Sequence, residues 1–258
     1  MPGLKKVLMN VSGILFVILM WELATAVFGW FKWIILPPPT DVFLALISMA
    51  ADGELWMHAS QSLIRVILGF AVAAIVAIPL GVAMGWIPAV SHIVDPIVEL
   101  LRPIPPIAWI GLALLWFGIG IQSAVFLVFI GAFFPILLNT ISGVRSVEKK
   151  LIEVALTFGA SDLEILKKVV LPAASPTIYT GLRVGMGIGW MCVVAAEMIA
   201  VDYGLGNLII EASNFAQTDR VLVGMISIGV LGLIINLIFQ IAGNRIFKWQ
   251  KGISSSRL

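Results

Sequence analysis

Long apolar segments with almost no charge are the feature that most constrains the fold of this chain. A helix that crosses a bilayer needs about 20 mostly apolar residues. Apolar residues make up 60% of the 258 residues and charged residues only 12%, too few to cover a soluble particle of this size. We therefore predict an all-α polytopic membrane protein with six transmembrane helices, at Val11–Gly29, Leu63–Trp86, Ile104–Gly118, Ile121–Ser142, Thr177–Val201 and Val221–Ala242.

The third of these segments is too short to cross a bilayer alone. An upstream apolar piece, Ile93–Leu101, precedes it, and Arg102-Pro103-Ile104-Pro105-Pro106 separates the two. Prolines lack the backbone N–H group that a helix needs, so they stop or kink it. We expect one span that is broken at these prolines.

The positions of Lys and Arg predict the orientation, because cytoplasmic loops carry an excess of both. With the N-terminus inside, only Lys32, Arg65 and Arg220 of the 16 basic residues lie outside. We therefore expect both termini and the 143–176 loop in the cytoplasm. The basic residues assigned to the inner side are Lys5, Lys6, Arg102, Arg145, Lys149, Lys150, Lys167, Lys168, Arg183, Arg245, Lys248, Lys251 and Arg257.

The N-terminal segment has two interpretations. Lys5-Lys6, an apolar run and Ala24-Thr25-Ala26 are also typical of a cleaved signal peptide. Trp21 and Glu22 interrupt the apolar run and favour a retained helix. Both alternatives leave the other spans in the same orientation.

Residues that carry catalytic or metal chemistry are scarce. Cys192 is the only cysteine and cannot form an intrachain disulfide, and His58 and His92 form no metal-ligand pattern. No Gly-Lys dipeptide occurs, so the phosphate-binding loop of ATPases is absent. We expect no catalytic residue, no metal site and no cofactor on this chain, and no nucleic-acid partner at a net charge of +2. If ATP drives the protein, another chain must bind it.

Small residues recur at four-residue spacing in two of the predicted spans. Such ridges let helix backbones approach closely in lipid. We expect them to pack helices within one subunit, with a sliding or dimer surface as the alternative. The two ridges are Gly69, Ala73, Ala77, Gly81 and Gly85, and Gly181, Gly185 and Gly189.

The 143–176 loop contains the pattern of two short helices. Gly159 follows the first helix as a C-cap candidate, and Ser161 and Glu164 form a capping box that begins a second helix. We expect Leu171-Pro172 to end that second helix. The first helix would carry one apolar face that can enter a groove on a partner protein, formed by Leu151, Val154, Ala155 and Phe158.

The same loop resembles the EAA loop of ABC-importer permeases. The resemblance rests on Glu153-Val154-Ala155, Gly159 and Val169-Val170-Leu171-Pro172, with Val154 where the family prefers Ala and Val169 where it prefers Ile. It implies that the loop couples the membrane helices to an ATPase. The coupling residues would be Glu153, Ala155, Phe158, Gly159, Val169, Leu171 and Pro172.

Further segments resemble the permeases for nitrate, sulfonate, taurine and bicarbonate, at residues 35–42, 101–109, 115–120, 131–140, 195–199 and 204–206. The resemblance implies a type I importer fold over one permease domain, 1–258, in a prokaryotic plasma membrane. It also implies a non-enzymatic subunit that assembles with a second permease copy, two cytoplasmic ATPases that hold ATP and Mg²⁺, and an external substrate-binding protein.

Ionisable and aromatic residues inside the spans are candidates for the translocation pathway. For each one a structural role is the alternative: Arg102 as an inner-side anchor, Glu197 and Glu22 as hydrogen-bonding partners. An ATPase-independent secondary transporter or channel is the alternative function, and it would couple through embedded acids such as Glu22 and Glu197. The pathway candidates are Arg102, Trp109, Asn139, Arg183, Trp190 and Glu197.

Overall fold

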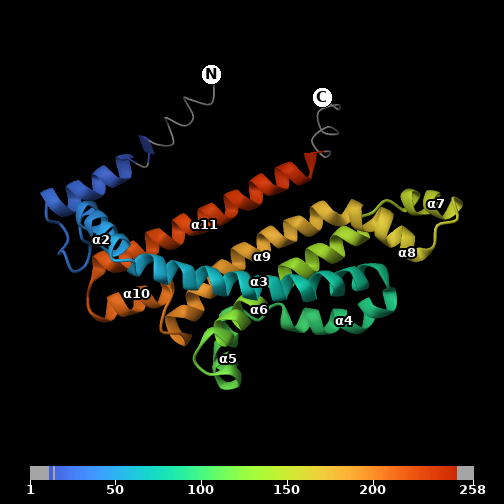
Figure 1. Ribbon diagram of the computed structural model, residues 1–258, viewed down its shortest axis with the longest axis horizontal. Coiled ribbons are helices and arrows are strands. Elements are labelled where there is room, and N and C mark those ends of the chain that lie inside the picture. The colour runs from blue at the N-terminus through green and yellow to red at the C-terminus, as the bar shows by residue number, and fades with distance from the viewer. Residues whose placement is uncertain (1–11, 14, 249–258) are drawn as a thin grey trace. The chain divides into compact units, whose positions relative to one another are not determined.

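The computed structural model describes residues 12–13 and 15–248, and this part of the chain is helical, without strands. Lys5, Lys6, Lys251 and Arg257 lie outside the described residues. The α-helices are α2 (Pro39–Ala51), α3 (Glu54–Trp86), α4 (Pro88–Leu101), α5 (Ile110–Phe117), α6 (Ile121–Arg145), α7 (Lys149–Thr157), α8 (Asp162–Ile165), α9 (Leu171–Ala200), α10 (Leu205–Asn214) and α11 (Thr218–Ile246). There are also two π-helices, η1 (Leu23–Val27) and η3 (Leu166–Val170), and a 3₁₀-helix, η2 (Pro106–Trp109) (Figure 1). The η1 stretch is the end of a longer apolar helix, Leu15–Val27.

Within the described residues, four helices are long and apolar enough to cross a membrane. They are α3, α6, α11 and the continuous helix Asp162–Ala200 that ends in α9. Each contains nearly all of one predicted span, which confirms those four predictions.

The predicted span Ile104–Gly118 is not one continuous helix. Two helical pieces, Pro88–Leu101 and Pro106–Phe117, meet at a bend of 89°. The break lies at the predicted prolines, but the upstream piece begins at Pro88 and is a full helix by itself. The pair forms a broken span or a re-entrant loop, and the prolines are the physical reason for the bend.

The first predicted span, Val11–Gly29, is only partly described. Leu15–Val27 is a shorter apolar helix, and Val11 lies outside the described residues. In this helix the Glu22 carboxylate accepts hydrogen bonds from the Thr40 backbone N–H (3.2 Å) and hydroxyl (3.1 Å). These bonds satisfy a donor at the N-terminus of α2, so Glu22 is a hydrogen-bonding partner in this structure.

Contacts divide the described chain into two units. Residues 12–61 and Tyr203–Gly229 form the first, and residues 62–202 and 230–248 form the second. The first unit holds α2, α10 and the start of α11. Its segments are joined by an Arg220–Glu54 ion pair and by a hydrogen bond from the Thr218 hydroxyl to the Ile34 carbonyl (2.6 Å).

The second unit is built around α6. The ridge of small residues on α3 packs against it: a Cβ atom on Gly69 would lie 2.5 Å from Val128 Cβ, and one on Gly81 would lie 2.7 Å from Thr140 Cβ. Separations below 3.0 Å are essentially forbidden, so glycine is required for this close approach.

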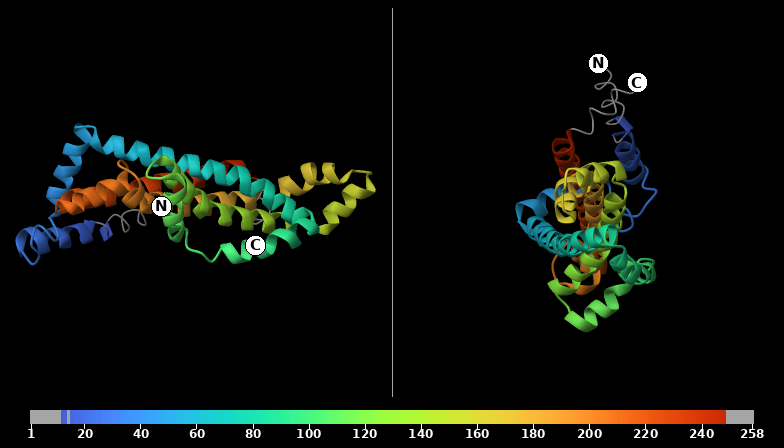
Figure 2. Two further views of the ribbon diagram at one scale, coloured as in Figure 1. Left: turned by 90° about the horizontal axis from the view of Figure 1, so that it is seen from below. Right: turned by 90° about the vertical axis from the view of Figure 1, so that its right-hand side faces the viewer.

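The ridge on α9 packs against another face of α6. A Cβ atom on Gly181 would lie 2.6 Å from Asn139 Cβ, and one on Gly185 would lie 2.9 Å from Ile136 Cγ1. Both ridges therefore pack helices within one chain, as expected, and α6 and α9 lie side by side (Figure 1; Figure 2, left).

Candidate functional site

The α7–α8 segment ends α7 with a specific hydrogen-bonded turn. The Gly159 N–H donates to the Leu156 carbonyl (2.9 Å) and the Ala160 N–H donates to the Ala155 carbonyl (3.1 Å). This pair of bonds is a Schellman motif, whose C′ residue needs a positive φ. Gly159 has φ +79°, so the predicted glycine C-cap is confirmed.

The capping box that begins α8 is also present. The Glu164 carboxylate accepts a hydrogen bond from the Ser161 backbone N–H (3.1 Å), and Glu164 pairs with Lys168 (2.9 Å). The turn between α7 and α8 is therefore fixed at both ends by local bonds. Figure 2 shows these two short helices next to each other beyond the end of α9.

The predicted apolar face of α7 is divided in the structure. Ile152 and Ala155 are half-buried and pack against a cluster formed by Val144, Ile165, Val170 and Ala174. Leu151, Val154 and Phe158 are exposed, and Phe158 is 86% exposed. Ala155 thus packs on its own chain rather than on the outer surface. The reason is that α7 lies on this cluster, so residues at i and i+3 turn inward.

The second short helix does not end at Leu171-Pro172, which corrects the sequence prediction. Instead α8 continues through the π-helix η3 directly into α9. Pro172 lacks an N–H group and its ring would crowd the Lys168 carbonyl. A wider π turn accommodates the ring without ending the helix. Val169 and Leu171 are half-buried here, and Pro172 is exposed.

The Glu153 side chain is exposed on α7, and its carbonyl accepts a hydrogen bond from the Thr157 hydroxyl (2.9 Å). Around it the segment exposes Lys149, Lys150 and Lys167. The surface of the segment therefore combines exposed apolar side chains with flanking charges, which suits protein recognition.

One side of α9 carries three of the predicted pathway residues. Arg183, Trp190 and Glu197 recur every seven residues, which is about two turns, so they lie along one face. Arg183 donates from Nε (3.0 Å) and Nη2 (2.9 Å) to Asn236 Oδ1 on α11. Trp190 is buried, with its indole against Gly232 of α11.

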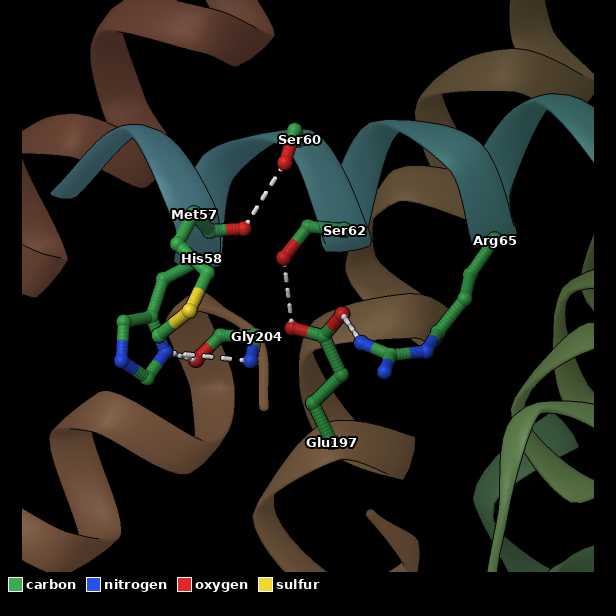
Figure 3. A network of polar contacts seen from close by, with 7 residues as sticks. All are labelled: Met57, His58, Ser60, Ser62, Arg65, Glu197 and Gly204. Atoms are coloured by element: carbon green, nitrogen blue, oxygen red, sulfur yellow. Dashed lines mark hydrogen bonds and ion pairs between the residues drawn. The ribbon is translucent and has the colours of Figure 1, made fainter. Parts of the chain in front are cut away.

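Glu197 lies in a buried polar network. Its side chain is 0% exposed and accepts hydrogen bonds from Ser62 Oγ (2.8 Å) and Arg65 Nη1 (2.8 Å), both on α3 (Figure 3). Arg65 is only 5% exposed. A fully enclosed, paired carboxylate supports the structural alternative for Glu197 rather than a pathway role.

Comparison with known proteins identifies the family. Residues 77–249 match the family model described as the binding-protein-dependent transport system inner membrane component. The chain belongs to this family. It is 41% identical over 219 residues to the taurine transport system permease protein of Escherichia coli, covering 83% of this chain and 80% of that one. It is 35% identical over 195 residues to the nitrate import permease protein of Leptolyngbya laminosa, covering 76% and 70%.

A protein of Methanocaldococcus jannaschii whose name assigns it as an ABC transporter permease is 46% identical over 252 residues, with 96% and 94% coverage. Among solved structures, the MetNI methionine ABC transporter in an inward-facing conformation matches with a TM-score of 0.61 at 22% identity. That match covers 72% of this chain and 91% of the other, and it shows the type I importer fold.

Family membership makes this chain a multi-pass inner-membrane permease subunit and not an enzyme; the ATPase is a separate subunit. It favours the ABC importer over an ATPase-independent carrier or channel. In the described residues, no group of His, Cys, Asp and Glu could hold a metal ion.

Three further pathway candidates of this permease lie away from the α9 face. Arg102 is the exposed C-cap of α4, at the bend. Trp109 packs edge-on against Phe126, and its enclosed Nε1 has no hydrogen-bond partner among the described residues. Asn139 donates to the Pro135 carbonyl (2.8 Å) within α6. The structure does not bring these three to the face of α9 that carries Arg183.

Sequence reasoning missed the pairing of Arg65. When the basic residues are assigned to the two sides of the membrane, Arg65 is placed outside. It falls, however, inside the predicted span Leu63–Trp86. A cation inside a span calls for a buried anionic partner. With Glu197 the one acid in the predicted span Thr177–Val201, that argument could have predicted the pair.

Proposed function

We propose that this permease imports a small anion of the sulfonate, taurine or nitrate class by alternating access. Relatives named for taurine, aliphatic sulfonates and nitrate support the substrate class. An external binding protein would deliver the substrate. Two copies of this chain, each acting as one domain over residues 1–258, would form the pathway between them.

The α7–α8 segment is the proposed coupling element within the 143–176 loop. Its exposed residues Leu151, Val154 and Phe158 would enter a groove on a cytoplasmic ATPase, which holds ATP and Mg²⁺. Glu153 would meet the ATPase surface, and the half-buried residues Ala155, Val169 and Leu171, together with Gly159 and Pro172, would hold the segment in position. The excess of Lys and Arg on the loop side supports a cytoplasmic location for the loop and both termini.

The observation that carries the proposal is the continuous helix from Asp162 to Ala200. A continuous helix transmits displacement along its length. Closure of the ATPase pair would therefore move α9 together with the docked segment, largely as a rigid body. ATP shifts the balance between the two states only by its different affinity for them.

We propose Trp190 and Arg183 as residues of the pathway face of α9, and Arg102, Trp109 and Asn139 as pathway candidates on other elements. Glu197 would hold α9 to α3. Thermal-shift measurements on the external binding protein with taurine, alkanesulfonates, nitrate and bicarbonate would identify the substrate. Stabilisation by bicarbonate alone, or by none of these compounds, would contradict the proposed class.

The coupling proposal predicts that Phe158→Ser and Glu153→Lys leave the permease inserted but remove the ATPase. An exposed aromatic that anchors an interface contributes about 2 kcal/mol or more to binding, so co-purification of the ATPase should fall by tenfold or more, at least with Phe158→Ser. The measurement is the amount of ATPase that co-purifies with tagged permease, together with uptake.

Leu163→Ser is the matched control, because Leu163 is also exposed (59%) but is not one of the three α7 residues proposed to enter the groove. It should retain the ATPase. Normal ATPase recovery and uptake by both the Phe158 and Glu153 variants would overturn the assignment of the coupling segment.

A further inference from the structure

A polar cleft lies between α9 and α11 in the second unit. Its volume is about 380 Å³, within the range of small-ligand sites. The helices converge because Gly243 faces Tyr179: a Cβ atom there would lie 2.6 Å from Tyr179 Cε1. The lining residues are Pro176, Tyr179, Thr180, Arg183, Phe239, Gln240, Gly243, Asn244 and Phe247.

The cleft contains a cation without an acidic partner. Arg65 and Arg145 each pair with a carboxylate, of Glu197 and Asp95. No described carboxylate lies within ion-pair distance of Arg183, and its bonds run to the neutral amide oxygen of Asn236. The lining itself holds no Asp or Glu. Since a charge in a membrane helix is costly unless it is paired, this arrangement favours an anionic ligand.

The other polar groups of the cleft suit an oxyanion. Both nitrogens that Arg183 uses bond to one oxygen, Asn236 Oδ1, and Nη1 takes no part in these bonds. Arg183 therefore keeps a charged donor group that an anion in the cleft could use. The side-chain amides of Gln240 and Asn244 are exposed beside it. By contrast, the Tyr179 hydroxyl is occupied, since it donates to the Phe239 carbonyl.

Arg183 lies nearer to one end of α9 than to the other, and its long side chain can extend toward the nearer interface. The residue lies about 18 Å along α9 from Leu171, at about 1.5 Å per residue. The 30 residues of α9 span about 45 Å at this rise, so Arg183 falls in the half of the helix that is nearer to the α7–α8 segment.

We propose that this cleft binds a phosphate-like or sulfonate-like oxyanion, with Arg183 as the charged donor and Gln240 and Asn244 as amide donors. The anion comes either from the headgroup of an acidic lipid or from a free anion at the inner mouth. Placing this site on the inner side of the membrane rests on the orientation given under the proposed function. The anion site itself does not require that orientation. It does not depend on the coupling segment.

The test uses the full-length permease with its ATPase in nanodiscs. In one arm, nanodiscs of phosphatidylglycerol and phosphatidylcholine are compared by native mass spectrometry for retained phosphatidylglycerol. In the other, inorganic phosphate and taurine are titrated into the complex in phosphatidylcholine alone. Arg183→Gln should weaken the binding that is observed by about tenfold, the loss of one charged hydrogen-bonding group.

Arg245→Gln is the matched control, because Arg245 is an exposed cation on α11 outside the cleft, and it should bind as the unaltered chain does. If Arg183→Gln does not fold, the double variant Gln240→Leu with Asn244→Leu keeps the cation and should still weaken binding several-fold. Retention of phosphatidylglycerol identifies a lipid site, and binding of phosphate or taurine identifies a free-anion site.

The proposal is overturned if no probe binds, if Arg183→Gln or the double variant binds as well as the unaltered chain, or if Arg245→Gln loses as much binding. ATPase co-purification, measured on the same samples, reports separately on the coupling segment. Failure of that proposal is therefore distinguishable from failure of the anion site.

Discussion

The α3–α6–α9 core and the α7–α8 segment both depend on glycine, but for different physical reasons. In the core, Gly69, Gly81 and Gly181 are helical, and each occupies a place where a Cβ atom would overlap a neighbouring helix. In the segment, an added Cβ on Gly159 would meet nothing within 4 Å, and its requirement is a φ of +79°. In the core, glycine is required because there is no space for a side chain. In the segment, glycine is required because the backbone has a positive φ.

This difference separates stability from coupling. Close packing in the core involves many atoms, so changes there should affect the free energy of unfolding. The α7–α8 segment is bonded locally and exposes much of its apolar surface, so changes there should affect association with the ATPase. The following predictions test this division.

The largest effect on stability is expected at the buried ion pair of the core. Glu197→Ala leaves Arg65 buried without its anionic partner, which costs about 3–5 kcal/mol. Thermal unfolding of the purified permease measures this loss. The double variant Arg65→Met with Glu197→Leu removes both charges and should be more stable than Glu197→Ala. Equal stability of Glu197→Ala and the unaltered chain would contradict the role given to the pair.

The next effect distinguishes two glycines of one helix. Gly185→Val places a side chain against Ile136 Cγ1 and the Ala132 carbonyl, and overpacking of this kind costs about 1–3 kcal/mol. Gly187→Val adds the same side chain where nothing lies within 4 Å. Unfolding temperatures should fall for Gly185→Val and change little for Gly187→Val. Similar shifts for both would show that helix propensity, not packing against α6, sets the requirement.

The smallest effect on stability is expected in the segment. Gly159→Val forces a side chain into the left-handed region, at a cost of about 1–2 kcal/mol, which local opening of the turn can relieve. ATPase co-purification should nevertheless fall sharply, whereas Gly159→Asn, which tolerates this region, should retain most of it. If Gly159→Val lost as much stability as Gly185→Val and still bound the ATPase, the segment would contribute to stability rather than to coupling. That result would contradict the division between the two regions.

The parts of the fold that follow simple periodicity could be predicted from the sequence. Four spans, both small-residue ridges, the Gly159 C-cap and the capping box need only local spacing, and the structure contains them. The predicted stop at Pro172 was wrong because a proline rule describes an α-helix, and a π turn offers another way to accommodate the ring. The partner of Arg65 is 132 residues away in the sequence, so local spacing does not identify it. Only the non-local argument that a cation inside a span needs an anionic partner could have done so.

The division of the predicted apolar face of α7 into half-buried and exposed residues also depends on contacts that are distant in the sequence. Sequence periodicity groups Leu151, Val154, Ala155 and Phe158, but it does not show where the cluster around Ile165 lies. Ile152 and Ala155 turn toward that cluster, and the other three stay exposed. Ala155 therefore belongs to the packing that holds the segment, and Phe158 belongs to the surface that it presents.

The π turn at Leu166–Val170 also determines how the α7–α8 segment is rotated about the axis of α9. A π turn is in effect a single-residue insertion into an α-helix, and each residue of an α-helix advances the chain by about 100° around the axis. The direction in which the α7–α8 segment lies around the axis of α9 therefore depends on this one inserted residue. Insertions or deletions elsewhere in the loop can change its length, but a change of one residue here would swing Phe158 about a quarter turn away from any surface that it contacts.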